Sequence, residues 1–106
     1  MLIGNLRPAN TSAAVLYAKP IGTRISIESI VIANTSAASA TFRIFWDYGT
    51  TYDETAALAY DVQIDAGSMI MLNDLSWDFI GQAGNLAVRS SVSNALTFWV
   101  WGKETN

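Results

Sequence analysis

Apolar and polar residues alternate with a period of two along most of this chain, and no stretch of useful length follows the helical period. The clearest segment, from Ala40 to Tyr48, carries a large apolar or aromatic residue at every second position. Such segments return roughly every 8–12 residues, which is typical of a sandwich or jelly roll. We therefore expect an all-β fold, an antiparallel, jelly-roll-like β-sandwich of about seven to eight short strands. The predicted strands cover residues 13–18, 23–33, 40–48, 58–64, 68–72, 86–90 and 96–101, and residues 73–84 are expected to form a long connection.

The second predicted strand changes phase in its middle. Ile25 and Ile27 share one parity, and Ile30 and Ile32 share the other. A β-bulge near Glu28-Ser29 would turn all four isoleucines to the core face. Alternatively, the strand passes from one sheet to the other at this point.

The last predicted strand, residues 96–101, is apolar on both faces. One face carries Trp99 and Trp101, where an ordinary half-buried strand would have polar residues. Phe45 likewise lies opposite the core face of its strand. We interpret Phe45, Trp99 and Trp101 as anchors of a subunit interface. The alternative is that loops of the same chain, such as residues 73–84, cover these faces.

The N-terminal residues 1–8 do not form a regular alternating element. Leu2, Ile3 and Leu6 are apolar, but the glycine, asparagine and proline among them discourage a strand or a helix. We divide the chain into an N-terminal arm, residues 1–8, and a single sandwich domain, residues 9–106. The arm is expected to reach a neighbouring subunit, although an extra edge strand on its own sheet is also open.

Composition favours self-association and disfavours several partner classes. Of the 106 residues, 51% are hydrophobic and only 14% are charged, against a usual charged share of about 25%. A small monomer normally needs more charge to stay dispersed. The net charge is −3 and the basic residues are scattered singly, so we expect no nucleic-acid partner. No apolar run is long enough for a membrane span, and the N-terminus does not resemble a signal peptide.

Candidate catalytic groups are few. The chain has no histidine and no cysteine, which removes the usual general base, thiol nucleophiles and thiolate metal sites. Ser90, Ser91 and Ser93 have only an arginine near them in sequence. A pair of carboxylates among Asp53, Glu54 and Asp61 would be the minimal set for a glycan-active enzyme. We expect no enzymatic activity and no cofactor.

Two further features allow ligand binding. The loop from Asp47 to Glu54 is rich in carboxyl and hydroxyl groups, but its spacing fits no standard calcium loop and capping of backbone amides explains it equally well. The aromatic residues Tyr48, Tyr52 and Trp77 could instead stack on sugar rings. This second interpretation predicts a receptor-binding module for a host-surface glycan.

Four segments, which make up more than a quarter of the chain, are residues 29–36 (SIVIANTS), 40–47 (ATFRIFWD), 49–54 (GTTYDE) and 84–91 (GNLAVRSS). They resemble small virion proteins of tailed bacteriophages. The resemblance implies an antiparallel β-sandwich in the phage particle and carries over no catalytic residue.

The resemblance leaves two placements open. The first is a capsid decoration, or cement, protein that forms a homotrimer and stabilises the head through contacts with the major capsid protein, which the arm residues Leu2, Ile3 and Leu6 would help to make. The second is a component of the tail or tail fibre. Either placement implies a virion protein that is assembled in the cytoplasm of the host bacterium.

Overall fold

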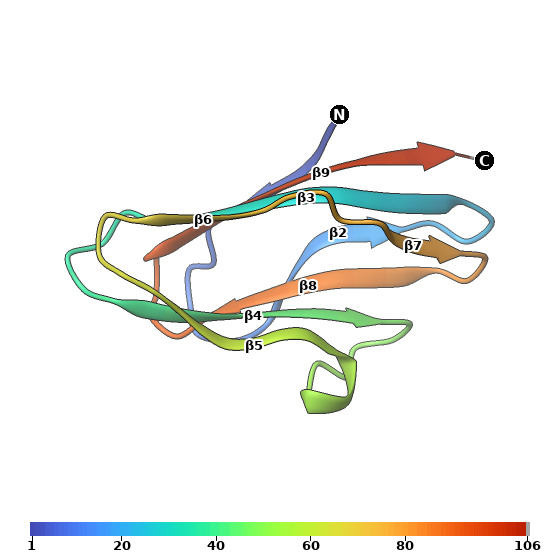
Figure 1. The fold of residues 1–106 in the computed structure, drawn as a ribbon. Coiled ribbons are helices and arrows are strands. Elements are labelled where there is room, and N and C mark those ends of the chain that lie inside the picture. The colour runs from blue at the N-terminus through green and yellow to red at the C-terminus, as the bar shows by residue number, and fades with distance from the viewer. Residues whose placement is uncertain (106) are drawn as a thin grey trace.

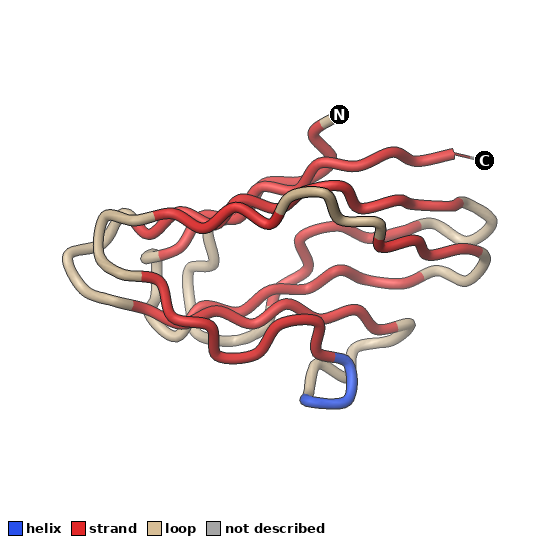
Figure 2. Tube along the Cα trace, viewed as in Figure 1, coloured by secondary structure: helices blue, strands red, loops and turns tan. Residues whose placement is uncertain are grey.

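The computed structural model describes residues 1–105 and consists almost entirely of β-strands (Figures 1 and 2). The predicted all-β sandwich is confirmed, with nine strands and one short 3-10 turn. The two strands beyond those predicted are the first and the seventh. The elements are β1 (Leu2–Leu6), β2 (Ala14–Lys19), β3 (Arg24–Asn34), β4 (Ala40–Asp47), η1 (Glu54–Ala56), β5 (Ala57–Ile64), β6 (Met69–Leu72), β7 (Trp77–Ile80), β8 (Gly84–Ser90) and β9 (Leu96–Thr105).

Two antiparallel sheets face each other. The five-stranded sheet has the order β1-β9-β3-β6, and β7 also pairs with β3; the four-stranded sheet has the order β2-β8-β4-β5. When β7 is set aside, this order is that of an eight-stranded jelly roll. Successive strands then alternate between the sheets, except for β4 and β5, which pair with each other in the four-stranded sheet. In Figure 1 β9, β3 and β6 of the five-stranded sheet lie above β8, β4 and β5 of the four-stranded sheet, and the N-terminus lies on the side of the five-stranded sheet.

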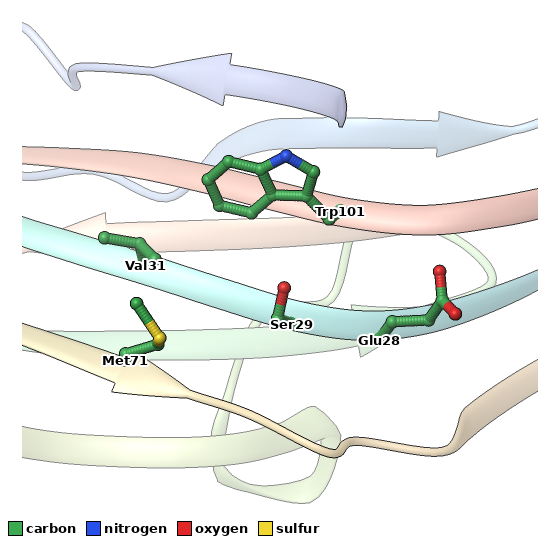
Figure 3. A pocket seen from close by; sticks show the side chains of 5 residues that line it. All are labelled: Glu28, Ser29, Val31, Met71 and Trp101. Atoms are coloured by element: carbon green, nitrogen blue, oxygen red, sulfur yellow. The ribbon is translucent and has the colours of Figure 1, made fainter. Parts of the chain in front are cut away.

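The phase change in β3 is a β-bulge. Its pairing with β9 shifts between Ile27 and Ser29, and β3 stays in one sheet throughout. The four isoleucines of β3 are all fully buried, as the bulge predicts. The extra residue leaves Glu28 and Ser29 on the same, outer side of the sheet (Figure 3). The alternative prediction, in which this strand passes from one sheet to the other, is therefore wrong.

The core fills the space between the two sheets. It consists of the inward-facing residues of both, and the rings of Phe42 and Phe98 join the sheets edge to face at a centroid distance of 6.3 Å. Such burial of apolar area is the main term that stabilises a sandwich. The fully buried members include Ile25, Ile27, Ile30, Ile32, Phe42, Ile44, Leu86, Val88, Leu96, Phe98 and Val100.

The N-terminal segment is not a separate arm, which corrects the expected boundary at residue 8. Residues 2–6 form β1, an edge strand that pairs with β9 of the same chain, in agreement with the alternative interpretation. Ile3 and Leu6 pack against the core, and only Leu2, 44% exposed, remains available for another chain. Close packing explains the glycine in this strand, because a Cβ on Gly4 would lie 2.6 Å from the carbonyl oxygen of Leu16.

Candidate interaction surface

The outer face of the five-stranded sheet carries an apolar surface, which we call the tryptophan face. The pairing places Trp99 beside Val31 and Val31 beside Met71, while Trp101 lies beside Ser29. The two indole rings stack at a centroid distance of 6.4 Å and an interplanar angle of 17°. The apolar members of the face are Leu2, Val31, Ala33, Met69, Met71, Trp99 and Trp101.

The tryptophan face is open to solvent. Met69 is 54% exposed and Met71 is 50% exposed, and both tryptophans are half-buried. The segment expected as a possible cover, residues 73–84, instead contributes Trp77 and Phe79 to the core through β7. The predicted orientation of the tryptophans away from the core is therefore correct, and the alternative in which that segment covers them is wrong.

A groove of about 450 Å³ crosses this face between Trp101 and Met71. Ser29 and Val31 lie between these two side chains, and Glu28 lies at one end of the group (Figure 3). Three of the five lining side chains are apolar, and a large exposed apolar area on a small domain is typical of a contact surface.

Phe45 lies on the outer side of the other sheet and is only 1% exposed. Its ring packs on Tyr52 at a centroid distance of 6.0 Å, because the loop after β4 folds back over the sheet. Phe45 is thus covered by its own chain. This burial corrects the expectation of an exposed Phe45, and we no longer count Phe45 among the anchors of an interface.

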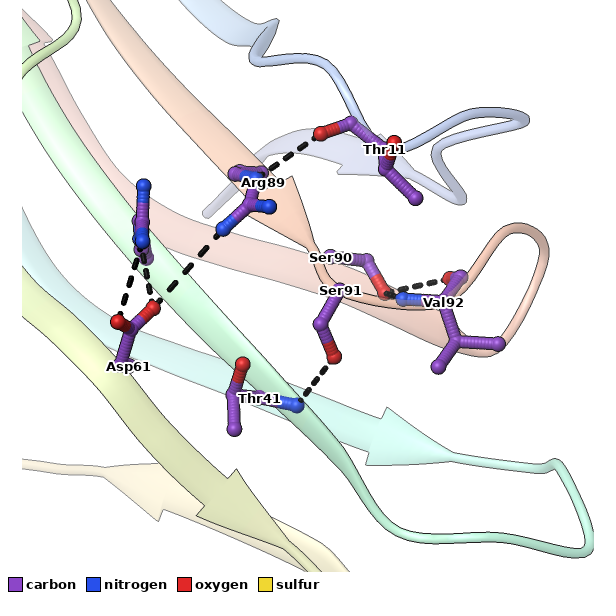
Figure 4. Close-up of polar contacts among 8 residues, drawn as sticks. Thr11, Thr41, Asp61, Arg89, Ser90, Ser91 and Val92 are labelled. Atoms are coloured by element: carbon purple, nitrogen blue, oxygen red, sulfur yellow. Dashed lines mark hydrogen bonds and ion pairs between the residues drawn. The ribbon is translucent and has the colours of Figure 1, made fainter.

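Ion pairs occupy another part of that outer face. Opposite Arg43, the bulge in β5 places both Tyr60 and Asp61, and Asp61 has a positive φ of 52°. The Arg43 guanidinium donates two hydrogen bonds to the Asp61 carboxylate, at 2.6 and 3.1 Å, and stacks on the Tyr60 ring at 4.0 Å. Arg89 approaches Asp61 at 3.9 Å and donates to the carbonyl of Thr11 at 2.9 Å (Figure 4). The hydrogen bonds from Arg43 hold the pKa of Asp61 below its usual value.

Two of the three serine candidates, Ser90 and Ser91, have structural partners. The Ser90 hydroxyl is fully buried and donates to the carbonyl of Val92 at 2.7 Å (Figure 4). The Ser91 hydroxyl accepts a hydrogen bond from the backbone N–H of Thr41 at 2.8 Å. Neither hydroxyl donates to a side-chain base, so the geometry does not assemble a nucleophile.

The carboxylates of the loop after β4 cap backbone amides. Asp47 accepts from the N–H groups of Gly49 and Thr51, and Asp53 accepts from that of Thr55. Hydrogen bonds from Thr55 lower the pKa of Asp53. Among residues 1–105 no group of three or more carboxylate, histidine or cysteine side chains is placed to hold a metal ion. No helix in this part of the chain is long and apolar enough to cross a membrane.

The three aromatic residues proposed for a glycan site are not brought together. Tyr48 is 55% exposed and meets Trp46 edge to face, Tyr52 covers Phe45, and Trp77 packs against the core from the other sheet. A different pocket, of about 400 Å³, combines Tyr52 with Tyr60. Its remaining lining residues are Arg43, Asp53, Glu54 and Thr55.

Sequence reasoning missed Met69 and Met71 as members of the tryptophan face. The segment from Met69 to Leu72 is apolar on both faces, which is the same pattern that singled out residues 96–101. This pattern in the sequence could therefore have indicated that β6 belongs to the same exposed surface.

No protein-family model and no curated protein matches this chain. Among solved structures, a chain in the structure of infectious bursal disease virus, Gx strain, shares the fold with a TM-score of 0.52 and 18% identity. The match covers 94% of this chain and 28% of that one, so this chain spans less than a third of its length. A chain of the Gt strain matches with a TM-score of 0.49 and 10% identity over 98% of this chain and 31% of that one. The match to the Gx-strain chain gives no support to an origin in tailed bacteriophages.

Proposed function

We propose that this protein is a non-enzymatic structural component of a virus particle and works through permanent contacts. The observation that carries the proposal is the tryptophan face, an apolar surface that the fold itself leaves open. The jelly-roll likeness to a chain from a virus structure supports the same conclusion by analogy of fold. The small charged share of the sequence, 14%, fits a protein whose surface is partly covered in an assembly.

In its finer form, the proposal is a capsid decoration protein that self-associates as a homotrimer and binds the major capsid protein of the particle. Trp99 and Trp101 would anchor the contact between subunits, and Leu2 would add to it from β1. An interface of standard size, about 800 Å² per partner, repeated over a shell, adds stability without any chemical step. The protein would then be a virion component assembled in the host cytoplasm, as the resemblance to phage proteins implies.

A tail component that binds host-surface glycan is the second candidate. It is favoured by the pocket that Tyr52 and Tyr60 line together with Glu54 and Thr55, since sugars bind where aromatic faces meet polar groups. A screen against bacterial surface polysaccharides tests it. Binding that is lost in Tyr60→Ala and kept in Trp101→Ala would favour this candidate over decoration.

The first experiment is the mass of the purified protein in solution, measured by light scattering after size exclusion. We expect a stable oligomer in the wild type and a monomer in Trp101→Ala, because that substitution removes one of the two largest side chains from the tryptophan face. Because Trp101 is half-buried, the unfolding midpoint of the variant should fall by no more than about 8 °C. In a domain of this size that fall corresponds to a loss of roughly 1 kcal/mol in the free energy of unfolding.

Val15→Ala is the matched control, because Val15 is 45% exposed on β2, in the other sheet. Its mass and midpoint should equal those of the wild type. An unchanged oligomer in Trp101→Ala together with a large loss of thermal stability would show that Trp101 serves folding alone. For a wild-type oligomer, binding to capsids that lack the protein then separates decoration from a tail location.

A further inference from the structure

The edges of both sheets are unsuited to pairing with another chain. In the five-stranded sheet, β1 has a register shift after Leu2, and the opposite edge consists of β6 and β7, which have only four residues each. In the four-stranded sheet, β2 is shifted between Val15 and Tyr17, and β5 contains the bulge at Asp61. Bulges and short strands at edges oppose continuation of a sheet into a second molecule. Association between copies must therefore use faces and loops.

A second groove continues the tryptophan face along β3 and β9 towards the end of the chain. It measures about 310 Å³ and is lined by Arg24, Ser26, Lys103 and Thr105, so we call it the basic groove. Arg24 already forms an ion pair with Asp78, and the carboxylate of Asp78 compensates its positive charge. Lys103 is exposed and makes no hydrogen bond or ion pair with any residue in the described range. Among residues 1–105 the basic groove thus has one cation without an ion-pair partner, Lys103, on the same face as Trp101.

The opposite charge projects from the other side of the molecule. The turn containing η1 extends outward from the four-stranded sheet (Figure 1). Its Asp53 carboxylate is occupied by capping Thr55, whereas Glu54 is exposed and has no hydrogen-bond or ion-pair partner within residues 1–105. Directly after the turn, Leu58 is 39% exposed. Glu54 lines the same pocket as Arg43 but forms no hydrogen bond or ion pair with it. We call residues 52–58, with this exposed carboxylate and this apolar side chain, the acidic turn.

We propose that the acidic turn of one copy binds in the basic groove and on the adjoining tryptophan face of a second copy. Glu54 would face Lys103 of the neighbour, and Leu58 would cover the apolar surface beside Trp101. Glu28, at the end of the Trp101–Met71 groove, carries a negative charge, so the incoming carboxylate is directed to Lys103 and away from that groove.

The two surfaces in this contact differ, so the contact is heterologous and can repeat around a closed ring such as a trimer. The inference rests on the proposed self-association and adds the identity of the surface that meets the tryptophan face. Apolar contact supplies most of the affinity in such an arrangement, and the charge pair fixes orientation and register.

Charge reversal tests the pairing. We expect Glu54→Lys and Lys103→Glu each to raise the protein concentration needed for half-maximal assembly by about tenfold or more in low salt, because each places like charges together. The double variant Glu54→Lys, Lys103→Glu should assemble as the wild type does, because the pair is restored with reversed signs. Asp65→Lys is the control: it makes the same charge change in the β5–β6 turn and should leave assembly unaltered. Light scattering over a concentration series provides the measurement.

The outcomes separate this inference from the proposed function. If Trp101→Ala dissociates the oligomer but the two charge reversals do not, the tryptophan face is an interface and the acidic turn is not its partner. Failure of the double variant to recover assembly would likewise overturn the pairing. A wild type that stays monomeric at every concentration reached would overturn both the self-association and this contact.

Discussion

The outer faces of the two sheets share the same sequence pattern but differ in how far their aromatic residues are exposed. In β4 and in β9, an aromatic residue interrupts the face that alternation assigns to polar side chains. Phe45 in β4 is 1% exposed under Tyr52, whereas Trp99 and Trp101 in β9 are only half-buried. Period-two alternation therefore identifies an aromatic residue that points away from the core, but it does not say whether the chain itself will cover that residue.

The difference comes from the segments that succeed each strand or lie beside it. After β4 the chain returns over the outer face, caps itself through Asp47 and Asp53, and brings Tyr52 onto Phe45. Beside β9 lie β1 and β3, whose outward residues pair with the two tryptophans in register. No loop is stacked on either indole ring among the described residues, and both tryptophans stay partly exposed. Coverage is thus decided by loop paths and strand neighbours that are distant in sequence, and only the uncovered face is available for assembly.

Phe45→Ala should produce the largest effect on the stability of the single chain. Removing a fully buried phenylalanine leaves a cavity under Tyr52 and should lower the free energy of unfolding by about 3–5 kcal/mol. Urea denaturation followed by fluorescence measures this change. Tyr48→Ala, three residues away and 55% exposed, is the control and should change the free energy by no more than about 0.5–1 kcal/mol. Equal losses in the two variants would mean that the loop does not cover Phe45.

The ion pairs on the outer faces of the two sheets should make stability depend on pH, with a smaller effect than that of Phe45→Ala. The Asp61 carboxylate has a lowered pKa because Arg43 donates hydrogen bonds to it, and Arg24 lowers the pKa of Asp78 in the same way. A carboxylate whose pKa is lower in the folded state stabilises the fold above its unfolded pKa, near 4. That stabilisation is lost as the pH falls through the lower, folded pKa.

Thermal unfolding between pH 7 and pH 2.5 measures this dependence. We expect the unfolding temperature of the wild type to fall once the pH drops below about 4. Asp61→Asn should lower the unfolding temperature at pH 7 and should make its fall in acid less steep. Asp65→Asn removes an exposed carboxylate that has no arginine partner among residues 1–105 and should keep the slope. An identical slope in wild type and Asp61→Asn would show that the Arg43 pair contributes nothing to folding.

Much of the fold was predictable because it depends on local alternation. Period-two segments located seven strands, and the parity change among the isoleucines of β3 located the bulge at Glu28. Two strands were missed for separate reasons. β1 contains glycine and asparagine and is held by pairing with β9, more than 90 residues away. β7 has four residues and lies between polar turns, where a short alternation carries little weight.

The candidate surface was predictable in orientation and not in extent. The sequence predicts that Trp99 and Trp101 point away from the core, because their parity is opposite to that of Phe98 and Val100. It does not predict that Met71 lies in the same row, since that contact depends on β6 pairing with β3. The arm was misassigned because apolar residues next to glycine and proline fit a detached segment as well as an irregular edge strand.

Met71→Lys should have the smallest effect on the folded chain and still separate the two outer faces. Met71 is 50% exposed on an edge strand, so a lysine there can extend into water and should change the free energy of unfolding by no more than about 0.5 kcal/mol. In the oligomer the ammonium group would lose its water where the apolar part of a second copy covers the tryptophan face, and burial of a charge in this way is strongly unfavourable. We therefore expect near wild-type denaturation together with a monomeric mass. Retention of the oligomer would place the contact elsewhere, because an exposed apolar surface that tolerates a charge is not the surface on which assembly depends. The two outer faces would then no longer differ in function.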